Sequence, residues 1–98
     1  MFFREIEMIF RVHVFISGNV QGVSFRWETL TKARNGNVNG WIRNLSDGRV
    51  EAVFEGEETM VKAMIDFCRQ GPSGARVNRV QVIYGEPMEN FKTFEIHF

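Results

Sequence analysis

The chain has 98 residues, enough to bury one hydrophobic core, and residues 1–98 are expected to form a single domain. The 12 Lys and Arg residues balance the 12 Asp and Glu residues, so the net charge at pH 7 is zero. This balance argues against the large basic surface of a protein that binds nucleic acid or membranes, and we predict neither partner. The single cysteine, Cys68, excludes an internal disulfide; it lies on the apolar side of a helical pattern and is expected to be a buried thiol.

The chain contains no candidate targeting or membrane segment. No stretch reaches the ~20 apolar residues of a membrane span. Residues 1–7 are too interrupted by charge to form the apolar region of a signal peptide, so a cytoplasmic protein is predicted. We expect a monomer, because no long apolar surface is evident, although Phe2 and Phe3 could pack against a neighbouring chain.

The first elements in chain order are a strand and a helix. Apolar side chains recur at every second position of residues 10–16, which is the pattern of a half-buried strand. A helix is expected over residues 24–36, but its pattern is weaker. Leu30 and Ala33 mark an apolar face, and Thr29 counts among the polar residues.

A hairpin and a second helix follow. Residues 38–44 and 49–54 are predicted strands, and the dipeptide Asp47-Gly48 has the chemistry of the turn between them. The helix after Gly56 is clearer, because its apolar residues recur at helical spacing. Its expected end is Gly71, followed by a proline that cannot continue it. Alternating residues at 80–84 and 94–98 predict the last strands.

This order, β-α-β-β-α-β with a further strand, predicts an α+β fold. The expected form is a ferredoxin-like α/β sandwich, in which an antiparallel sheet carries two helices on one face. A strand-helix-strand unit crosses over in the right-handed sense, so the first two strands should end at the same edge of the sheet. The loop at residues 18–24 and Asn44 are expected to meet there. The last strand should run toward the same edge, and we predict that the carboxylate of Phe98 pairs with Arg26.

The segment at residues 16–26 leads from a strand through two glycines into a helix and ends on an arginine. Such a turn lets backbone N–H groups converge on one point, and the helix dipole adds positive potential there. Arg26 can present a fork of donors to phosphate oxygens, although a tight connection with a solvated arginine is the simpler interpretation. The predicted phosphate-binding loop consists of Gly18, Asn19, Val20, Gln21, Gly22, Val23 and Ser24.

The residues around this loop restrict the chemistry. A thiol phosphatase would need a cysteine where Val20 stands, and no Gly-Lys-Ser/Thr follows for a nucleotide with its magnesium. No Ser-His-acid set or metal-ligand cluster is evident, so water is the expected nucleophile, and neither a metal nor a cofactor is expected. A site of this kind suits phosphoryl transfer with a good leaving group such as a carboxylate.

Two segments carry recognisable motifs. Residues 18–26 read Gly-x-Val-Gln-Gly-Val-x-Phe-Arg, and residues 40–51 contain Gly-Trp-Ile-Arg-Asn and Asp-Gly-Arg-Val-Glu. Both resemble the signatures of the acylphosphatases. The resemblance covers roughly residues 8–98. It implies hydrolysis of acyl phosphates to a carboxylate and inorganic phosphate, with Arg26 binding the phosphate and Asn44 orienting the attacking water. The alternatives are a surface salt bridge for Arg26 and a hairpin-capping amide for Asn44.

The chain departs from the usual family pattern at Glu28, where an apolar residue is usual, and at residues 35–39, which replace a Leu-Gly-Leu run. Both changes are expected to weaken the packing of the first helix. Ser24 is expected to cap that helix rather than act as a nucleophile, and Gln21 to serve as a structural hydrogen-bonder. The remaining aromatic and histidine candidates are expected to pack or to face away from the site, and they are Phe25, Trp41, His13 and His97.

Two other functional classes share features of this sequence. RNA-recognition modules use the same topology, but the strand at residues 48–54 lacks their basic and aromatic pattern. The second alternative is a non-catalytic module that binds phosphate or carboxyl phosphate, as found within larger enzymes. Turnover distinguishes it from a small enzyme that acts on a small-molecule acyl phosphate.

Overall fold

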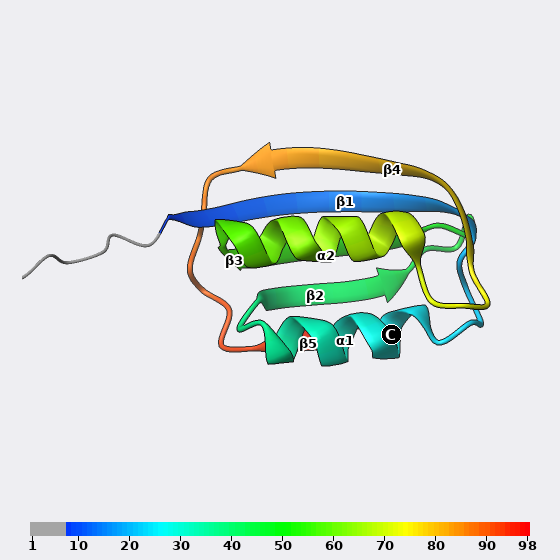
Figure 1. The fold of residues 1–98 in the computed structure, drawn as a ribbon, viewed down its shortest axis with the longest axis horizontal. Helices are drawn as coiled ribbons and strands as arrows, with labels where there is room; N and C mark the ends of the chain where they lie inside the picture. The colour runs from blue at the N-terminus through cyan, green and yellow to red at the C-terminus, as the bar shows by residue number, and fades with distance from the viewer. Residues whose placement is uncertain (1–7) are drawn as a thin grey trace, which may run out of the picture.

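The computed structural model describes residues 8–98, so Phe2 and Phe3, named above as residues that could pack against a neighbouring chain, lie outside the described residues. In this part of the chain, five strands and two helices follow one another in the predicted order, β-α-β-β-α-β with a further strand (Figure 1). The elements are β1 (Ile9–Asn19), α1 (Phe25–Asn35), β2 (Asn39–Asn44), β3 (Val50–Glu57), α2 (Glu58–Gln70), β4 (Arg76–Gly85) and β5 (Phe94–Ile96).

The strands form one sheet in the order β4-β1-β3-β2-β5. β3 lies between β1 and β2 and is antiparallel to both, with Ala52 opposite Val14 on one side and Ile42 on the other. β1 and β2 therefore run in the same direction, as the right-handed crossover predicts. α1 packs on β2 and β5, and α2 packs on β1, β3 and β4, so both helices cover one face (Figure 1). The ferredoxin-like α+β sandwich is confirmed.

One strand pairing differs from the predicted antiparallel sheet. β5 lies parallel to β2, with Ile96 opposite Ile42, so the sheet is mixed. The reason is topological. β4 ends at the edge of the sheet where β2 begins, and the segment between β4 and β5 runs along this edge to the start of β5 (Figure 1). β5 therefore runs in the direction of β2, toward the edge that carries the expected site.

The core confirms the strand and second-helix patterns. Val12, Val14 and Ile16 of β1 are fully buried. Cys68 of α2 is buried beside them and is a free thiol, as expected. Burial raises the pKa of this thiol to about 12, so it stays protonated at neutral pH and is a poor nucleophile.

The packing of α1 departs from its apolar pattern. Thr29 is fully buried, although the sequence analysis counted it as polar, and with Phe25 and Ala33 it faces the sheet. Its hydroxyl donates a hydrogen bond of 2.7 Å to the carbonyl oxygen of Phe25. This bond removes the penalty of burying the hydroxyl, which is why a threonine substitutes for an apolar residue here. Leu30 is only partly buried against the core.

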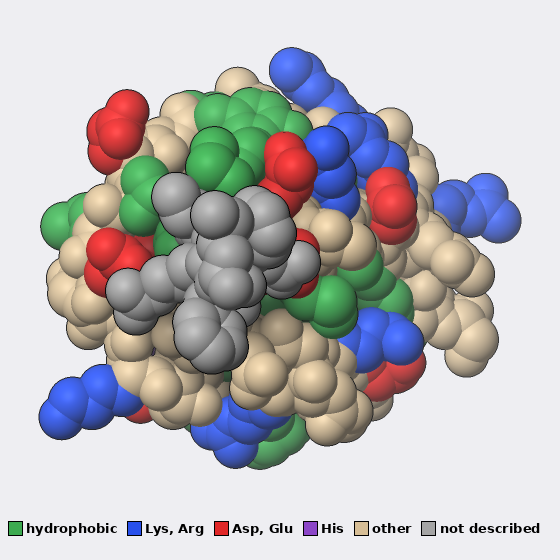
Figure 2. Space-filling model, turned by 60° about the vertical axis from the view of Figure 1, so that its left-hand side comes forward, with side chains coloured by type: hydrophobic (Ala, Val, Ile, Leu, Met, Phe, Trp, Pro, Cys, Tyr) green, Lys and Arg blue, Asp and Glu red, His purple; other side chains and the backbone are tan. Residues whose placement is uncertain are grey.

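The surface carries charges of both signs. In the view of Figure 2, acidic and basic side chains are interspersed, so neither sign covers this face. No helix within residues 8–98 has the length and apolar character needed to cross a membrane.

The first testable prediction concerns Gly40 in β2. Its φ is +135°, and a Cβ there would collide with the carbonyl oxygen of Val53 on β3. Gly40→Ala is expected to lower the free energy of unfolding by about 3 kcal/mol or more in urea denaturation, because backbone strain and overpacking combine. The matched control is Gly48→Ala, where φ is +95° but the space is open. This control should lose about 1–2 kcal/mol through strain alone, and equal losses would contradict the role assigned to the β2–β3 contact.

Candidate active site

Two segments far apart in the sequence meet at the edge where β1 and β2 end. The loop between β1 and α1, the first turn of α1 and the end of β2 surround a hollow of about 260 Å³. The predicted phosphate-binding loop thus lies beside Asn44, as the parallel direction of β1 and β2 requires. The lining residues are Val20, Gly22, Ser24, Phe25, Arg26, Trp27 and Asn44.

The other members of the predicted loop support the hollow without lining it. Gly18 and Asn19 end β1 and pair with β4. Val23 packs against the core, and Gln21 binds the neighbouring hairpin. Val20 lines the hollow and is also almost fully buried. The loop is therefore anchored at both of its ends.

The backbone of this loop enters left-handed conformations. φ is +74° at Gly22 and +63° at Ser24. Turns that combine left- and right-handed residues direct successive N–H groups toward one side and form anion-binding concavities. Within residues 8–98, no N–H group of residues 21–24 donates a hydrogen bond to another backbone group. These donors are available to a bound anion.

Ser24 does not cap α1 through its side chain, so that prediction is wrong. It occupies the N-cap position, but its hydroxyl makes no capping hydrogen bond. An N-cap residue normally has extended backbone geometry, which brings its side-chain oxygen to the N–H groups of the first turn. The left-handed conformation of Ser24 removes this geometry. The first turn of α1 is thus left without a side-chain cap at the edge of the hollow, where its N–H groups favour an anion.

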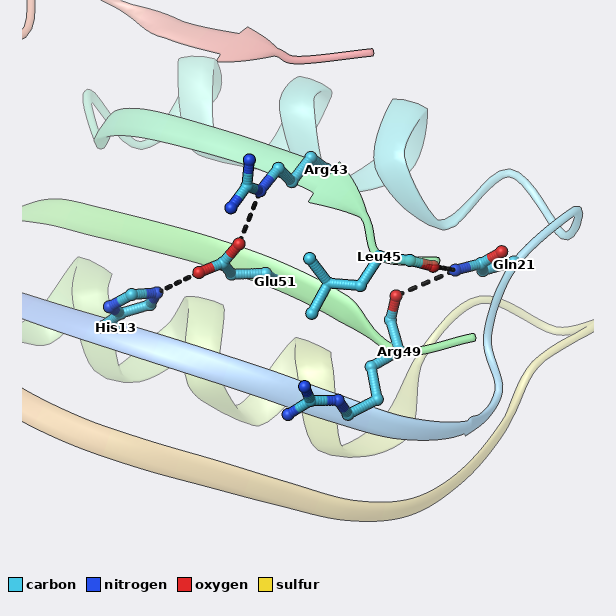
Figure 3. A network of polar contacts seen from close by, with 6 residues as sticks. All are labelled: His13, Gln21, Arg43, Leu45, Arg49 and Glu51. Atoms are coloured by element: carbon cyan, nitrogen blue, oxygen red, sulfur yellow. Dashed lines mark hydrogen bonds and ion pairs between the residues drawn. The ribbon is translucent and has the colours of Figure 1, made fainter. Parts of the chain in front are cut away.

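Gln21 ties the loop to the hairpin that carries Asn44. Its side-chain amide donates hydrogen bonds of 2.8 Å to the carbonyl oxygen of Leu45 and 2.9 Å to that of Arg49 (Figure 3). These carbonyls belong to the two sides of the β2–β3 turn, and Leu45 follows Asn44 directly. The expectation that Gln21 acts as a structural hydrogen-bonder is confirmed, and its two bonds set the distance between the loop and Asn44.

Arg26 lies in the first turn of α1 and lines the hollow. Its guanidinium carbon is 5.1 Å from the centroid of the Phe98 ring. The predicted pairing with the carboxylate of Phe98 is not found: no carboxylate in residues 8–98 forms an ion pair with Arg26. The last strand does reach this edge, but it presents the face of its aromatic ring. A cation–π contact orients the guanidinium and leaves its N–H donors for phosphate oxygens.

Asn44 is the last residue of β2 and lines the hollow. Its Oδ1 atom is buried and has no hydrogen-bond partner within the described residues. Leaving a buried acceptor unsatisfied costs about 1–3 kcal/mol, so such atoms in folded proteins call for an explanation. A water or substrate group in the hollow would provide the missing donor.

The opposite face of the sheet holds a separate polar network. Glu51 of β3 lies between Arg43 at 2.6 Å and His13 at 2.7 Å (Figure 3). Burial by itself would raise the pKa of Glu51, but hydrogen bonds from Arg43 and His13 outweigh it and hold the pKa below its ordinary value of 4.5. His97 stacks on Trp41, with ring centroids 5.3 Å apart. Neither histidine lines the hollow, which matches their expected places.

One lining residue was missed by the sequence analysis. Trp27 follows Arg26 and is 58% exposed, whereas Phe25 on its other side is buried as expected. A large aromatic residue directly after the signature arginine was the available signal.

Within residues 8–98, no group of three or more His, Cys, Asp or Glu side chains is placed to hold a metal ion.

Comparisons with known proteins identify the family that this chain resembles. The family model described as Acylphosphatase matches residues 12–96. An acylphosphatase of Chloroflexus aurantiacus is 61% identical over 77 residues, which cover 79% of this chain and 84% of the relative. One of Haloarcula marismortui is 51% identical over 88 residues, covering 90% and 96%. The crystal structure of acylphosphatase from Bacillus subtilis matches with a TM-score of 0.87 and 28% identity, over 93% of this chain and 100% of that one.

The role of Gln21 can be tested with a substitution that keeps its size. Gln21→Glu replaces the amide donor with an acceptor that faces the carbonyls of Leu45 and Arg49. We expect the free energy of unfolding to fall by about 1–3 kcal/mol in urea denaturation. The matched control is Gln81→Glu in the edge strand β4, where no such bond is present among the described residues. An equal effect at both positions would contradict the proposed tie.

The network of Glu51 predicts how stability depends on pH. Because the pKa of Glu51 is lower in the folded than in the unfolded state, the ionised group stabilises the fold above pH 4.5. This contribution is lost as the pH falls through the lower, folded pKa. In urea denaturation over an acidic pH series, Glu51→Gln should therefore lose less stability than the wild type. A Glu51→Gln curve parallel to the wild type would refute the assignment.

Proposed function

The chain belongs to the acylphosphatase family, and we propose that it hydrolyses the carboxyl–phosphate bond of a small-molecule acyl phosphate. Water is the nucleophile, and neither a metal nor a covalent intermediate takes part. The observation that carries the proposal is that groups without an internal hydrogen-bond partner in residues 8–98 gather around one hollow. They are the N–H groups of Gly22 and Ser24, the guanidinium of Arg26 and the Oδ1 atom of Asn44.

The phosphoryl group binds in the loop. The N–H groups of the loop and the N-terminus of α1 surround its oxygens, and Arg26 adds a charged fork. Phosphoryl transfer needs positioning and charge stabilisation more than covalent help, since charge is spread over the equatorial oxygens in the transition state. The ring of Phe98 supports this step by holding the Arg26 guanidinium in place.

The attacking water is held by Asn44. Oδ1 accepts a hydrogen bond from the water and directs its oxygen toward phosphorus. A phosphorus–oxygen bond forms to the water, and the bond to the acyl oxygen breaks, so the carboxylate departs with the electron pair. The proton of the water passes to a phosphate oxygen of the substrate. Among residues 8–98, no carboxylate or imidazole lines the hollow to accept it.

The same inventory favours an acyl phosphate over an alkyl phosphate. A carboxylic acid has a pKa near ~4, so its anion leaves without protonation. An alkoxide would need a general acid or a metal to neutralise it.

We further propose that residues 1–98 act as one domain and as a monomer in the cytoplasm, without a nucleic-acid or membrane partner. The balanced charge and the single core shared by both helices support this assignment.

The proposed roles are tested by hydrolysis of a simple acyl phosphate with excess chelator. The wild type should turn over without metal. Arg26→Ala and Asn44→Ala should each lower kcat/KM by about 10²–10³ or more, the range found when one charge-stabilising donor is removed. Arg79→Ala in β4 and Asn90→Ala in the loop before β5 are exposed controls and should retain wild-type activity.

The stability of the same variants separates catalysis from folding. Asn44→Ala removes an unsatisfied buried oxygen, so its free energy of unfolding should not fall in proportion to its activity. A folded wild type that binds inorganic phosphate without turnover would leave the non-catalytic binding module as the function. Normal activity of either variant would overturn the assigned roles.

A further inference from the structure

A second hollow runs along the outer face of α1 and joins the first. Its volume is about 510 Å³. Ser24 and Trp27 line both hollows, so the second begins where the phosphate site ends. Its lining residues are Ser24, Trp27, Glu28, Thr31, Lys32 and Asn35.

Trp27 is placed on this face by the geometry of the helix. Phe25 is buried against the sheet, and two residues further along an α-helix the side chain has turned by about 200°. Trp27 therefore points away from the sheet and is 58% exposed. Within residues 8–98, its indole forms none of the aromatic or cation–π pairs that involve the other aromatic side chains of the site and open face. The ring is free to stack against a ligand.

The direction of the reaction leads to the same face. Attack at phosphorus is in line, so the leaving group departs on the side opposite the water. Asn44 holds the water at the end of β2, within the sheet layer. With the phosphate bound, as proposed, in the hollow between Asn44 and the first turn of α1, the acyl group extends away from the sheet, toward the outer face of α1. Trp27 is the large apolar side chain that borders the hollow on that side.

The charges beside Trp27 favour a neutral acyl group. Glu28 lines the hollow one residue further along and would repel a second carboxylate. Lys32, at the far end, places its ammonium 5.1 Å from the centroid of the Phe67 ring on α2. The cation is thus already in contact with the protein. An uncharged group gains most from this surface, and a flat one can lie against the indole.

We propose that Trp27 forms a subsite for the acyl part of the substrate and selects acyl phosphates with a flat, uncharged aromatic group. This inference rests on the proposed function of the neighbouring site. Trp27 acts on binding, because the contact between indole and acyl group is present before and during bond cleavage. An interaction of equal strength in both states lowers KM and leaves kcat unchanged.

The test compares benzoyl phosphate with acetyl phosphate, which lacks the ring. Trp27→Ala should raise the KM for benzoyl phosphate about 5- to 10-fold, the scale of a lost aromatic stack. The kcat for benzoyl phosphate, both constants for acetyl phosphate and inhibition by inorganic phosphate should stay near wild type. Trp27→Phe retains a flat ring and should restore most of the affinity. Tyr84→Ala in β4 removes another exposed aromatic side chain far along the sheet and should change nothing.

The outcomes distinguish this inference from the proposed function. Wild-type protein that hydrolyses neither compound would overturn the function itself. Wild-type protein that hydrolyses both, with Trp27→Ala changing the two KM values equally or not at all, would overturn only the acyl subsite. A fall in kcat with both compounds would show that Trp27 shapes the phosphate site instead, and would also refute the subsite.

Discussion

The antiparallel pairing of β3 with both β1 and β2 is the constraint on which the rest of the structure depends. It forces β1 and β2 to run the same way and to end at one edge. A glycine-rich loop leaves the sheet from the first strand, and an asparagine ends the second. Neither segment has a site by itself. The sheet brings them together, and the amide of Gln21 then joins them with two hydrogen bonds.

At this edge the fold leaves polar groups that have no internal hydrogen-bond partner in residues 8–98. They are the N–H groups of Gly22 and Ser24 in the loop, the guanidinium of Arg26 and the Oδ1 atom of Asn44, and all four residues line the same hollow. Each would stabilise the protein more if it were satisfied internally. From their common location we infer, as part of the proposed function, that the missing partner is a ligand that offers acceptors to the first two and a donor to the third. A phosphate with its attacking water has this composition.

Two adjacent residues of β2 lie on opposite faces of the sheet, one in an ion pair between strands and the other at the candidate site. Side chains alternate along a strand, so Arg43 and Asn44 point to opposite sides. Arg43 pairs with Glu51 of β3 on the open face and strengthens the contact between the strands. The ion pair of Arg43 with Glu51 on the open face therefore helps to hold the end of β2, and Asn44 with it, in position. The charged network and the candidate site share a strand, and no side chain in residues 8–98 belongs to both.

The sequence by itself determined the order of elements, because periodicity and glycine positions are local properties. Its signature spacing also predicted the phosphate-binding loop and the pair Arg26 and Asn44. Only the tertiary structure decided that Thr29 is buried, that Ser24 leaves α1 uncapped and that Phe98 meets Arg26 through its ring. Each of these depends on which surfaces and backbone angles the packed sheet imposes. Strand register and crossover connections decide which residues lie beside one another across the sheet. The spacing of residues along the chain does not show which atoms these neighbours present to each other.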